Sequence, residues 1–189
     1  MKAVKEYLVP TATLCVICLI AAFLLGLTNN VTAGRIAELA VQAEAEARME
    51  VLPSAKSFGE GIEDEASGCT YAEAFDENGN SLGYAVTAIG EGGYGGKITA
   101  MVGINADGTV NLVSILDQSE TASIGGKLMS QDSFLNRFIG LSGSAALKKN
   151  GGTVDAVTGA TKTSTGITNA VNNALACVQG LKGEVSADG

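Results

Sequence analysis

A run of 20 mostly apolar residues, Leu8–Leu27, constrains this chain more than any other part of its sequence. No charged side chain occurs from Tyr7 through Gly34. At the rise of an α-helix, a run of that length covers about 30 Å, the hydrocarbon thickness of a bilayer. A cleaved signal peptide is the alternative, but the run is longer than a typical signal core and no well-defined cleavage site follows it. We therefore predict that residues 1–30 hold a short N-terminus and a retained transmembrane anchor.

Basic residues flank the apolar run unequally. Lys2 and Lys5 precede it, whereas the first basic residue after it is Arg35. Because short loops rich in Lys and Arg tend to stay in the cytoplasm, the N-terminus is expected there. The sequence thus predicts a single-pass protein of the cell membrane, with everything after about residue 30 on the extracytoplasmic side.

An amphipathic helical pattern follows the anchor from Arg35 to Leu52. Its apolar residues recur at spacings of three and four, and Pro53 ends the pattern. Periodicity identifies an apolar face but not what covers it, so a partner protein and the chain's own domain suit this face equally. We assign residues 31–68 to this stalk helix and to a loose acidic linker, Ser54–Gly68.

Strand patterns dominate the next part, with Asn, Asp and Gly at the turns, most clearly at Asn105–Gly108. A short helix is expected at Asp132–Ile139. A longer one begins near Thr163–Thr165 and ends at Gly183, leaving residues 184–189 as a tail. The fold expected for residues 69–183 is α+β, with helices packed on a mostly antiparallel sheet. The predicted strands are Tyr71–Phe75, Leu82–Ile89, Ile98–Ile104 and Val110–Leu116.

Composition excludes several classes of function. The net charge is −8 and there is no His, so the chain lacks a basic surface for nucleic acid, the commonest metal ligand and the commonest general base. We interpret Cys15 and Cys18, inside the apolar run, as small hydrophobic residues. Outside the cytoplasm Cys69 and Cys177 are able to form a disulfide, and the sequence does not decide between that bond and two thiols; we treat both as free. We predict no metal site and no catalytic side chain.

The glycine-rich segment Gly90–Lys97 does not fit a phosphate-binding loop. Glu91 stands where a Walker pattern needs Gly, and Ile98 stands where it needs Ser or Thr. We interpret the segment as a flexible connection, with Tyr94 in a position to lie near a planar ligand.

The most specific pattern is Asp155–Thr161, which reads Asp-Ala-Val-Thr-Gly-Ala-Thr directly before the long helical pattern. A helix N-terminus presents unpaired N–H groups and partial positive charge, which suit a phosphate. Gly159 permits close approach of the backbone, and Ala160 adds little bulk. An ordinary helix cap is the commoner explanation of such a turn, because Ser and Thr are preferred caps. The available hydroxyl groups belong to Thr158, Thr161, Thr163, Ser164 and Thr165.

This pattern resembles the flavinylation motif of FMN-binding domains, Asp-x-x-(Ser/Thr)-Gly-Ala-Thr, at every specified position. A chance match at five positions is on the order of one in a million per site. The resemblance implies that Thr161 carries FMN through its phosphate, after transfer from FAD by a separate flavin transferase. It also implies that Asp155 helps this transferase or caps the turn, since a carboxylate facing the phosphate would repel it.

A second match to the same family lies at residues 119–127. There the family has a Glu-Thr-Pro-Gly-Leu-Gly loop that borders the flavin, and Glu120, Thr121 and Gly125 agree with it. We therefore add Glu120 and Thr121 to the expected FMN site. The backbone shape of the loop is not carried over, because three residues differ, namely Ala122, Ser123 and Ile124.

One membrane helix followed by a single such domain is similar to the G-subunit family of the Rnf complex. That resemblance implies an electron-transfer subunit of an ion-translocating ferredoxin:NAD oxidoreductase, relaying electrons through one covalent FMN on the extracytoplasmic side. Its implied partners are the other Rnf subunits, with their iron–sulfur and flavin groups, and the flavin transferase. The alternatives are the C subunit of the sodium-translocating NADH:quinone reductase and a membrane-anchored binding module without flavin.

Overall fold

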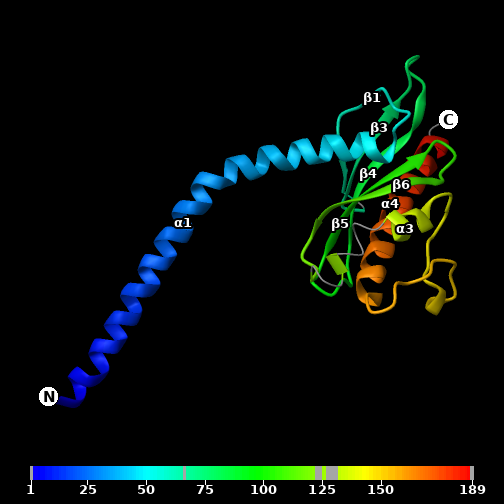
Figure 1. Cartoon of the computed structure of the whole chain (residues 1–189). Helices are drawn as coiled ribbons and strands as arrows, with labels where there is room; N and C mark the ends of the chain where they lie inside the picture. Colours follow the sequence, from blue (N-terminus) through cyan, green and yellow to red (C-terminus); the bar gives the residue numbers. More distant parts are fainter. Residues whose placement is uncertain (1, 66, 122–124, 127–131, 188–189) are drawn as a thin grey trace. The chain divides into compact units, whose positions relative to one another are not determined.

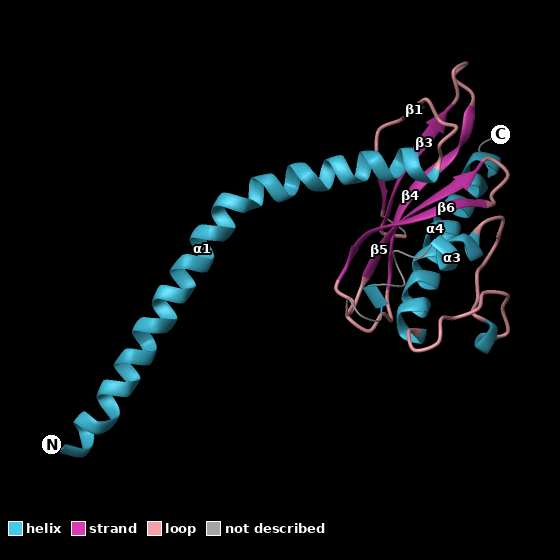
Figure 2. Ribbon diagram, viewed as in Figure 1, coloured by secondary structure: helices cyan, strands magenta, loops and turns pink. Residues whose placement is uncertain are grey.

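The computed structural model describes residues 2–65, 67–121, 125–126 and 132–187 (Figures 1 and 2). The chain divides into two compact units, residues 1–43 and 44–189. The α+β fold is confirmed: helices accompany one sheet in which every strand pairing is antiparallel. The domain boundaries expected at residues 30, 68 and 183 remain predictions.

Helix α1 (Lys2–Val51) contains both helical segments expected near the N-terminus. Within it, an 18-residue window reaches a mean hydropathy of 2.6 and is 0% buried within the protein. This helix is long and apolar enough to cross a bilayer, where its side chains would meet lipid rather than water. The helix ends at Val51, because Pro53 cannot continue it.

The sheet of the second unit has the strand order β1-β3-β4-β5-β6, and β2 pairs with β3 beside β1. Strands β3 to β6 correspond to the four expected strands. The prediction of a loose linker over Ser54–Gly68 was wrong, because β1 and β2 lie within it. These short strands complete the outer edge of β3, where backbone N–H and C=O groups would otherwise be unpaired. The strands are β1 (Ser57–Phe58), β2 (Ile62–Asp64), β3 (Cys69–Phe75), β4 (Ser81–Gly90), β5 (Ile98–Asn105) and β6 (Val110–Gln118).

The two faces of the sheet bury separate cores, because successive side chains of a strand point to opposite faces. On one face, Ile98, Ala100 and Val102 of β5 pack with helix α4 (Thr161–Ala187). On the other, Met101 packs with Val51 from the last turn of α1. The apolar face predicted for the stalk is therefore partly covered by the chain's own domain. The residues of this face that belong to the second unit, Ala47 and Val51, are 5% and 0% exposed.

Helix α4 lies close against β4 at two glycines. A Cβ atom added to Gly90 would lie 1.9 Å from the carbonyl oxygen of Gly166 and 2.5 Å from the backbone nitrogen of Ala170. Only Gly leaves room for this approach, which sets where the first turns of α4 lie on the sheet.

The helices differ in extent from the sequence-based expectation. Helix α4 begins at Thr161, slightly before the predicted start, and it continues past Gly183 to Ala187. The predicted end at Gly183 was therefore wrong, since that residue stays within the helix. The short helix expected at Asp132–Ile139 is present as α3 (Asp132–Leu135) and the 3-10 helix η2 (Asn136–Phe138). A further 3-10 turn, η3 (Lys148–Asn150), precedes the Asp155–Thr161 segment.

Candidate functional site

The segment before α4 is a tight turn with one defined shape. The Ala160 N–H donates to the Val157 carbonyl at 3.0 Å, and Gly159 has a φ of 85°. A positive φ at the third residue is the mark of a type II turn, which requires Gly or Asn there. The Ser164 hydroxyl braces the turn, accepting from the Val157 N–H at 3.2 Å and donating to the Ala160 carbonyl at 2.9 Å.

Ala160 occupies the N-cap position of α4. Its carbonyl accepts the first hydrogen bond of the helix, from the Ser164 N–H at 2.9 Å. Alanine has no side-chain oxygen, so it cannot satisfy the first-turn N–H groups as Ser, Thr, Asp or Asn would. The simpler explanation of an ordinary threonine cap therefore does not describe this turn. The N–H groups and the partial positive charge of the first turn suit an anion instead.

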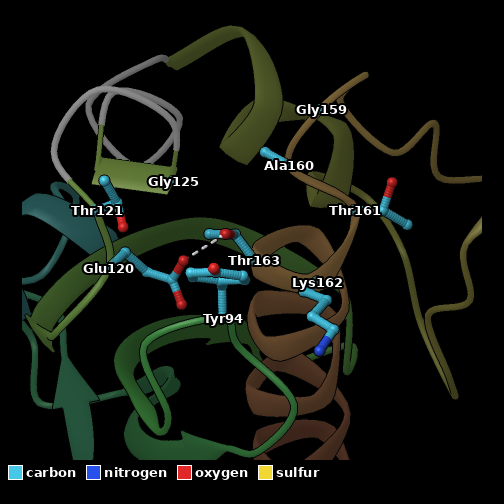
Figure 3. Close-up of a pocket in the computed structure, with 9 residues that line it drawn as sticks. All are labelled: Tyr94, Glu120, Thr121, Gly125, Gly159, Ala160, Thr161, Lys162 and Thr163. Carbon is cyan, nitrogen blue, oxygen red and sulfur yellow. Dashed lines mark hydrogen bonds between the residues drawn. The ribbon is translucent and has the colours of Figure 1, made fainter.

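Thr161, the first residue of α4, differs from the hydroxyl residues that follow it. The hydroxyls of Ser164, Thr165 and Thr168 donate to carbonyls one turn earlier, and that of Thr163 donates to Glu120. Among the residues that the structure describes, the partly exposed Thr161 hydroxyl has no hydrogen-bond partner. In Figure 3 its side chain points away from Glu120 and Thr163. Within the described part of the chain, Thr161 is thus the residue of this helix start whose hydroxyl makes no hydrogen bond.

A cavity of about 320 Å³ opens at this turn. That volume falls at the lower end of the range for small-molecule sites, about 300–1,000 Å³. The cavity combines the start of a helix with an aromatic ring, a carboxylate and an ammonium group. It is lined by Tyr94, Glu120, Thr121, Gly125, Gly159, Ala160, Thr161, Lys162 and Thr163 (Figure 3).

Glu120 joins three segments of the site. The residue is only 9% exposed, and its carboxylate accepts from the Gly95 N–H at 2.9 Å and from the Thr163 hydroxyl at 2.6 Å. A Cβ on Gly125 would lie 2.4 Å from this carboxylate, so a small residue is needed there. The glycine-rich connection expected to be flexible is held at Gly95, where a Cβ would lie 1.9 Å from the Ser119 carbonyl oxygen.

Tyr94 and Lys162 supply the aromatic and cationic groups of the cavity. Tyr94 is 73% exposed, and the Lys162 ammonium nitrogen lies 5.9 Å from the centroid of its ring. That separation is within the usual range for a cation–π contact. An exposed ring suits stacking on a planar ligand, while the ammonium group suits an anionic one.

The structure brings most of the predicted site residues together. Asp155 and Thr158 are the exceptions, since they do not line the cavity. The Asp155 carboxylate pairs with the Lys148 ammonium at 2.7 Å, and its carbonyl accepts from Arg137 at 2.5 Å. Thr158 is exposed at the turn. The residues that do line the cavity are Glu120, Thr121, Gly159, Ala160, Thr161 and Thr163.

Sequence reasoning missed Lys162 altogether. The sequence feature that could have predicted it is its position directly after Thr161, on the first turn of the helix. A cation at that position reinforces an anion-binding site. Tyr94 was noted only as a neighbour of a planar ligand, and Gly125 only as a matching residue. The departures from the family loop at residues 122–124 lie outside the described residues.

We expect Glu120→Ala to lower the free energy of unfolding by about 2–4 kcal/mol, because two donors lose their acceptor in a buried place. Chemical denaturation of the full chain in detergent measures the change. Glu120→Gln keeps a carbonyl oxygen and should lose about half as much. Thr121→Ala, an exposed neighbouring change, should stay within about 0.5 kcal/mol of the unmodified chain. An alanine variant at position 120 as stable as that control would show that the carboxylate is not a structural acceptor.

Comparison with known proteins identifies the family. Residues 93–176 match the model of the FMN-binding domain, which takes in the Gly95 loop, Glu120 and the first half of α4. The G subunit of the Na(+)-translocating ferredoxin:NAD(+) oxidoreductase complex of Acetobacterium woodii is 35% identical over 185 residues, covering 88% of each chain. The chain belongs to the Rnf G-subunit family. The G subunit of the ion-translocating oxidoreductase complex of Methanosarcina acetivorans is 32% identical over 190 residues, which are 97% of this chain and 100% of that protein.

Membership of the Rnf G-subunit family confirms the expected resemblance and supports FMN as the ligand of the domain. It also agrees with a single membrane-spanning segment in α1. Among solved structures, Shewanella oneidensis NqrC aligns with a TM-score of 0.46 and 18% identity, over 69% of this chain and 74% of that one.

Proposed function

We propose that this chain is the electron-relay subunit of an Rnf complex and carries one FMN, covalently bound through Thr161, on the extracytoplasmic side of the membrane. The observation that carries the proposal is the Thr161 hydroxyl, which has no partner among the described residues and lies at a helix start whose N-cap is alanine. The named relatives belong to an ion-translocating oxidoreductase complex, and one of them to a ferredoxin:NAD(+) oxidoreductase. Its partners would be the other subunits of that complex.

The residues around the cavity fit the two halves of FMN. The phosphate needs donors and positive charge, which the first-turn N–H groups of α4 and Lys162 supply. The planar ring needs a flat apolar surface, which the exposed Tyr94 ring offers. Gly159 contributes no side chain, and a Cβ there would meet nothing within 4 Å, so the approach to Thr161 is open.

Thr161 is the acceptor in the proposed attachment. Its oxygen forms a bond to the flavin-side phosphorus of FAD, the bond between that phosphorus and the AMP oxygen breaks, and the hydroxyl proton leaves to solvent. A flavin transferase would catalyse this exchange. Asp155 is exposed and paired with Lys148, so it is accessible to the transferase and kept from repelling the phosphate.

The proposal accounts for a site without the usual catalytic groups. The chain has no His, and Glu120, the carboxylate that the described residues contribute to the cavity, is held by two donors. FMN, when bound, supplies the redox chemistry, and the protein supplies position and charge. Glu120 and Thr163 would fix the walls of the site, while Tyr94 and Lys162 would set the surroundings of the flavin.

Covalent attachment has a direct test. The full chain, produced together with the flavin transferase, should fluoresce as a flavoprotein in a denaturing gel, and the chain produced without the transferase should not. Trypsin releases Thr161 within the peptide Asn150–Lys162, so mass spectrometry should find FMN on that peptide. A dark band despite an active transferase would contradict covalent attachment and favour the binding module without flavin.

The extracytoplasmic position predicts a specific pattern of proteolysis. Protease added to intact spheroplasts should digest the unit formed by residues 44–189, whereas inverted membrane vesicles should protect it. A cytoplasmic marker protein must survive in the spheroplasts as a control. Protection of this unit in spheroplasts, with digestion in inverted vesicles, would contradict the orientation predicted from Lys2 and Lys5 and would place the unit in the cytoplasm.

A further inference from the structure

Two buried thiols meet where β3 and α4 pack together, apart from the residues that line the cavity. Cys69 is the first residue of β3 and is 1% exposed, and Cys177 of α4 is 2% exposed. Both are free and belong to one core cluster. Their side chains share a hydrogen bond.

Cys69 contacts the helical turn that precedes Cys177. The Cys69 Sγ lies 3.8 Å from the carbonyl oxygen of Asn173, which is one helical turn before Cys177. Helix side chains lean toward the N-terminus and cover the preceding turn, so the Cys177 thiol lies over the same turn that Cys69 contacts. The two thiols lie within hydrogen-bonding reach of each other, and rotation about their side-chain torsions is the movement that would bring the sulfur atoms together.

The surroundings make Cys69 the more reactive thiol of the pair. The hydrogen bond from Cys177 lowers the pKa of Cys69 to about 7, outweighing the burial and the nearby Asp64 carboxylate that raise it, and Ser67 assists the lowering. Donating that hydrogen bond, together with burial, raises the pKa of Cys177. The thiolate is the attacking form in exchange, so the reactivity of Cys69 should increase as the pH rises through about 7.

We propose that Cys69 and Cys177 form a disulfide that ties α4 to β3 when the chain meets an oxidised thiol–disulfide exchange protein or a small-molecule disulfide. This modification goes beyond the proposed function and does not depend on FMN. The extracytoplasmic position proposed for the domain would expose it to such oxidants.

The exchange is balanced in two steps. The Cys69 thiolate attacks one sulfur of the oxidant disulfide, forms a mixed disulfide with it and releases the other sulfur as a thiolate. Cys177 then loses its proton and attacks the Cys69 sulfur, which frees the second sulfur of the oxidant. Two thiols of the chain are oxidised by two electrons, and one disulfide of the oxidant is reduced to two thiols, which take up the two protons.

Two exposed residues lie next to Cys69 in the chain. Ser67 and Gly68, immediately before Cys69, are exposed. The Ser67 hydroxyl accepts from the Cys69 N–H at 3.3 Å, so this turn lies directly against the cysteine. An oxidant would reach Cys69 before α4 packs on the sheet during folding, since Cys69 is 1% exposed in the folded chain.

The bridge would act on the stability of the fold. It would close a loop between positions 69 and 177, and the chain-entropy model gives long loops the larger stabilisation. For a loop of that length, we expect the midpoint of thermal unfolding to rise by about 10 °C. At a rise of about 1.5 Å per residue, Thr161 lies about 24 Å from Cys177 along α4. FMN attachment at Thr161 should therefore not depend on the disulfide.

The test uses the full chain in detergent, with Cys15→Ala and Cys18→Ala in every sample to remove the other thiols. One portion is kept in dithiothreitol and another in a buffer of oxidised glutathione. Each portion is denatured, its remaining thiols are alkylated, and it is digested with trypsin. After the oxidising buffer, we expect the peptides Ser57–Lys97 and Thr163–Lys182 to be joined, each containing one cysteine. Cys69→Ser and Cys177→Ser should each abolish the joined peptide and the rise in the unfolding midpoint.

Two results would overturn the proposal. The first is that both peptides remain alkylated after the oxidising buffer, and the second is that each carries glutathione without joining the other. The FMN peptide Asn150–Lys162 contains no cysteine, so the same digest reports flavin attachment separately. Joined peptides together with an FMN peptide that lacks flavin would therefore support the disulfide and contradict covalent attachment. Separate peptides together with a flavin-bearing FMN peptide would contradict the disulfide and support covalent attachment.

Discussion

Thr161→Ala should abolish the flavin fluorescence of the denatured chain, because the variant lacks the oxygen that would bond to the FMN phosphorus. The change should leave the fold intact. The Thr161 side chain is partly exposed and has no hydrogen-bond partner among the described residues, so its loss should alter the free energy of unfolding by no more than about 0.5 kcal/mol. In-gel fluorescence, the mass of the Asn150–Lys162 peptide and a denaturation curve measure both effects on one preparation.

Two control variants distinguish the loss of the FMN attachment site from a general effect of removing a hydroxyl group from α4. Thr165→Ala removes a hydroxyl one turn later, which donates to the Thr161 carbonyl at 2.9 Å, and should keep full labelling. Thr161→Ser keeps an oxygen at the same place and should keep detectable labelling. Flavin retained in Thr161→Ala, with FMN found on Thr158 or Thr153 of the same peptide, would place the attachment elsewhere.

Gly90→Ala should lower the free energy of unfolding by about 3 kcal/mol or more, the upper end of what overpacking costs. The added methyl group would lie 1.9 Å from a backbone oxygen of α4, which cannot rotate away as a side chain would. Helix α4 must therefore shift from β4, and its first turns would move relative to Glu120. The two measurements are a chemical denaturation curve and the yield of FMN labelling, and both should fall.

Gly180→Ala is the matched control on the same helix. A Cβ there would meet nothing within 4 Å, and Gly180 lies inside α4. Alanine at such a position should raise the free energy of unfolding by about 0.5–1 kcal/mol and leave labelling unchanged. If Gly90→Ala were as stable as Gly180→Ala, the close packing of α4 on β4 would not be what positions the site.

Periodic patterns and a specific motif were readable without coordinates. The 20-residue apolar run repeats a preference for an apolar environment over the full length of a membrane-spanning helix, so a helix is predicted there. The run Ile98–Ile104 repeats a preference for burial over the length of a strand, so a buried strand is predicted there. The Asp155–Thr161 motif predicted the start of a helix, and α4 begins at Thr161. Strands β1 and β2 were missed because segments of two and three residues are too short to show a period.

Contacts between distant segments account for what the sequence could not predict. Glu120 appeared to belong to a surface loop, and its burial follows from Gly95 and Thr163, which lie 25 and 43 positions away. The ion pair between Asp155 and Lys148 depends on how η3 leads into the turn. Gly183 looked like a helix end because glycine usually takes that place, but the helix continues to Ala187.

The alanine at the N-cap of α4 has a consequence for protein engineering. Ser or Asp at position 160 would satisfy a first-turn N–H group and raise the stability of the free chain by about 0.5–2 kcal/mol. A library selected only for heat resistance would therefore favour these residues. Their oxygen would compete with a phosphate for the same donors, so the variants that survive heating best should be the poorest substrates for flavin loading. Selection for thermal stability and selection for a loaded cofactor should thus choose different residues at this one position.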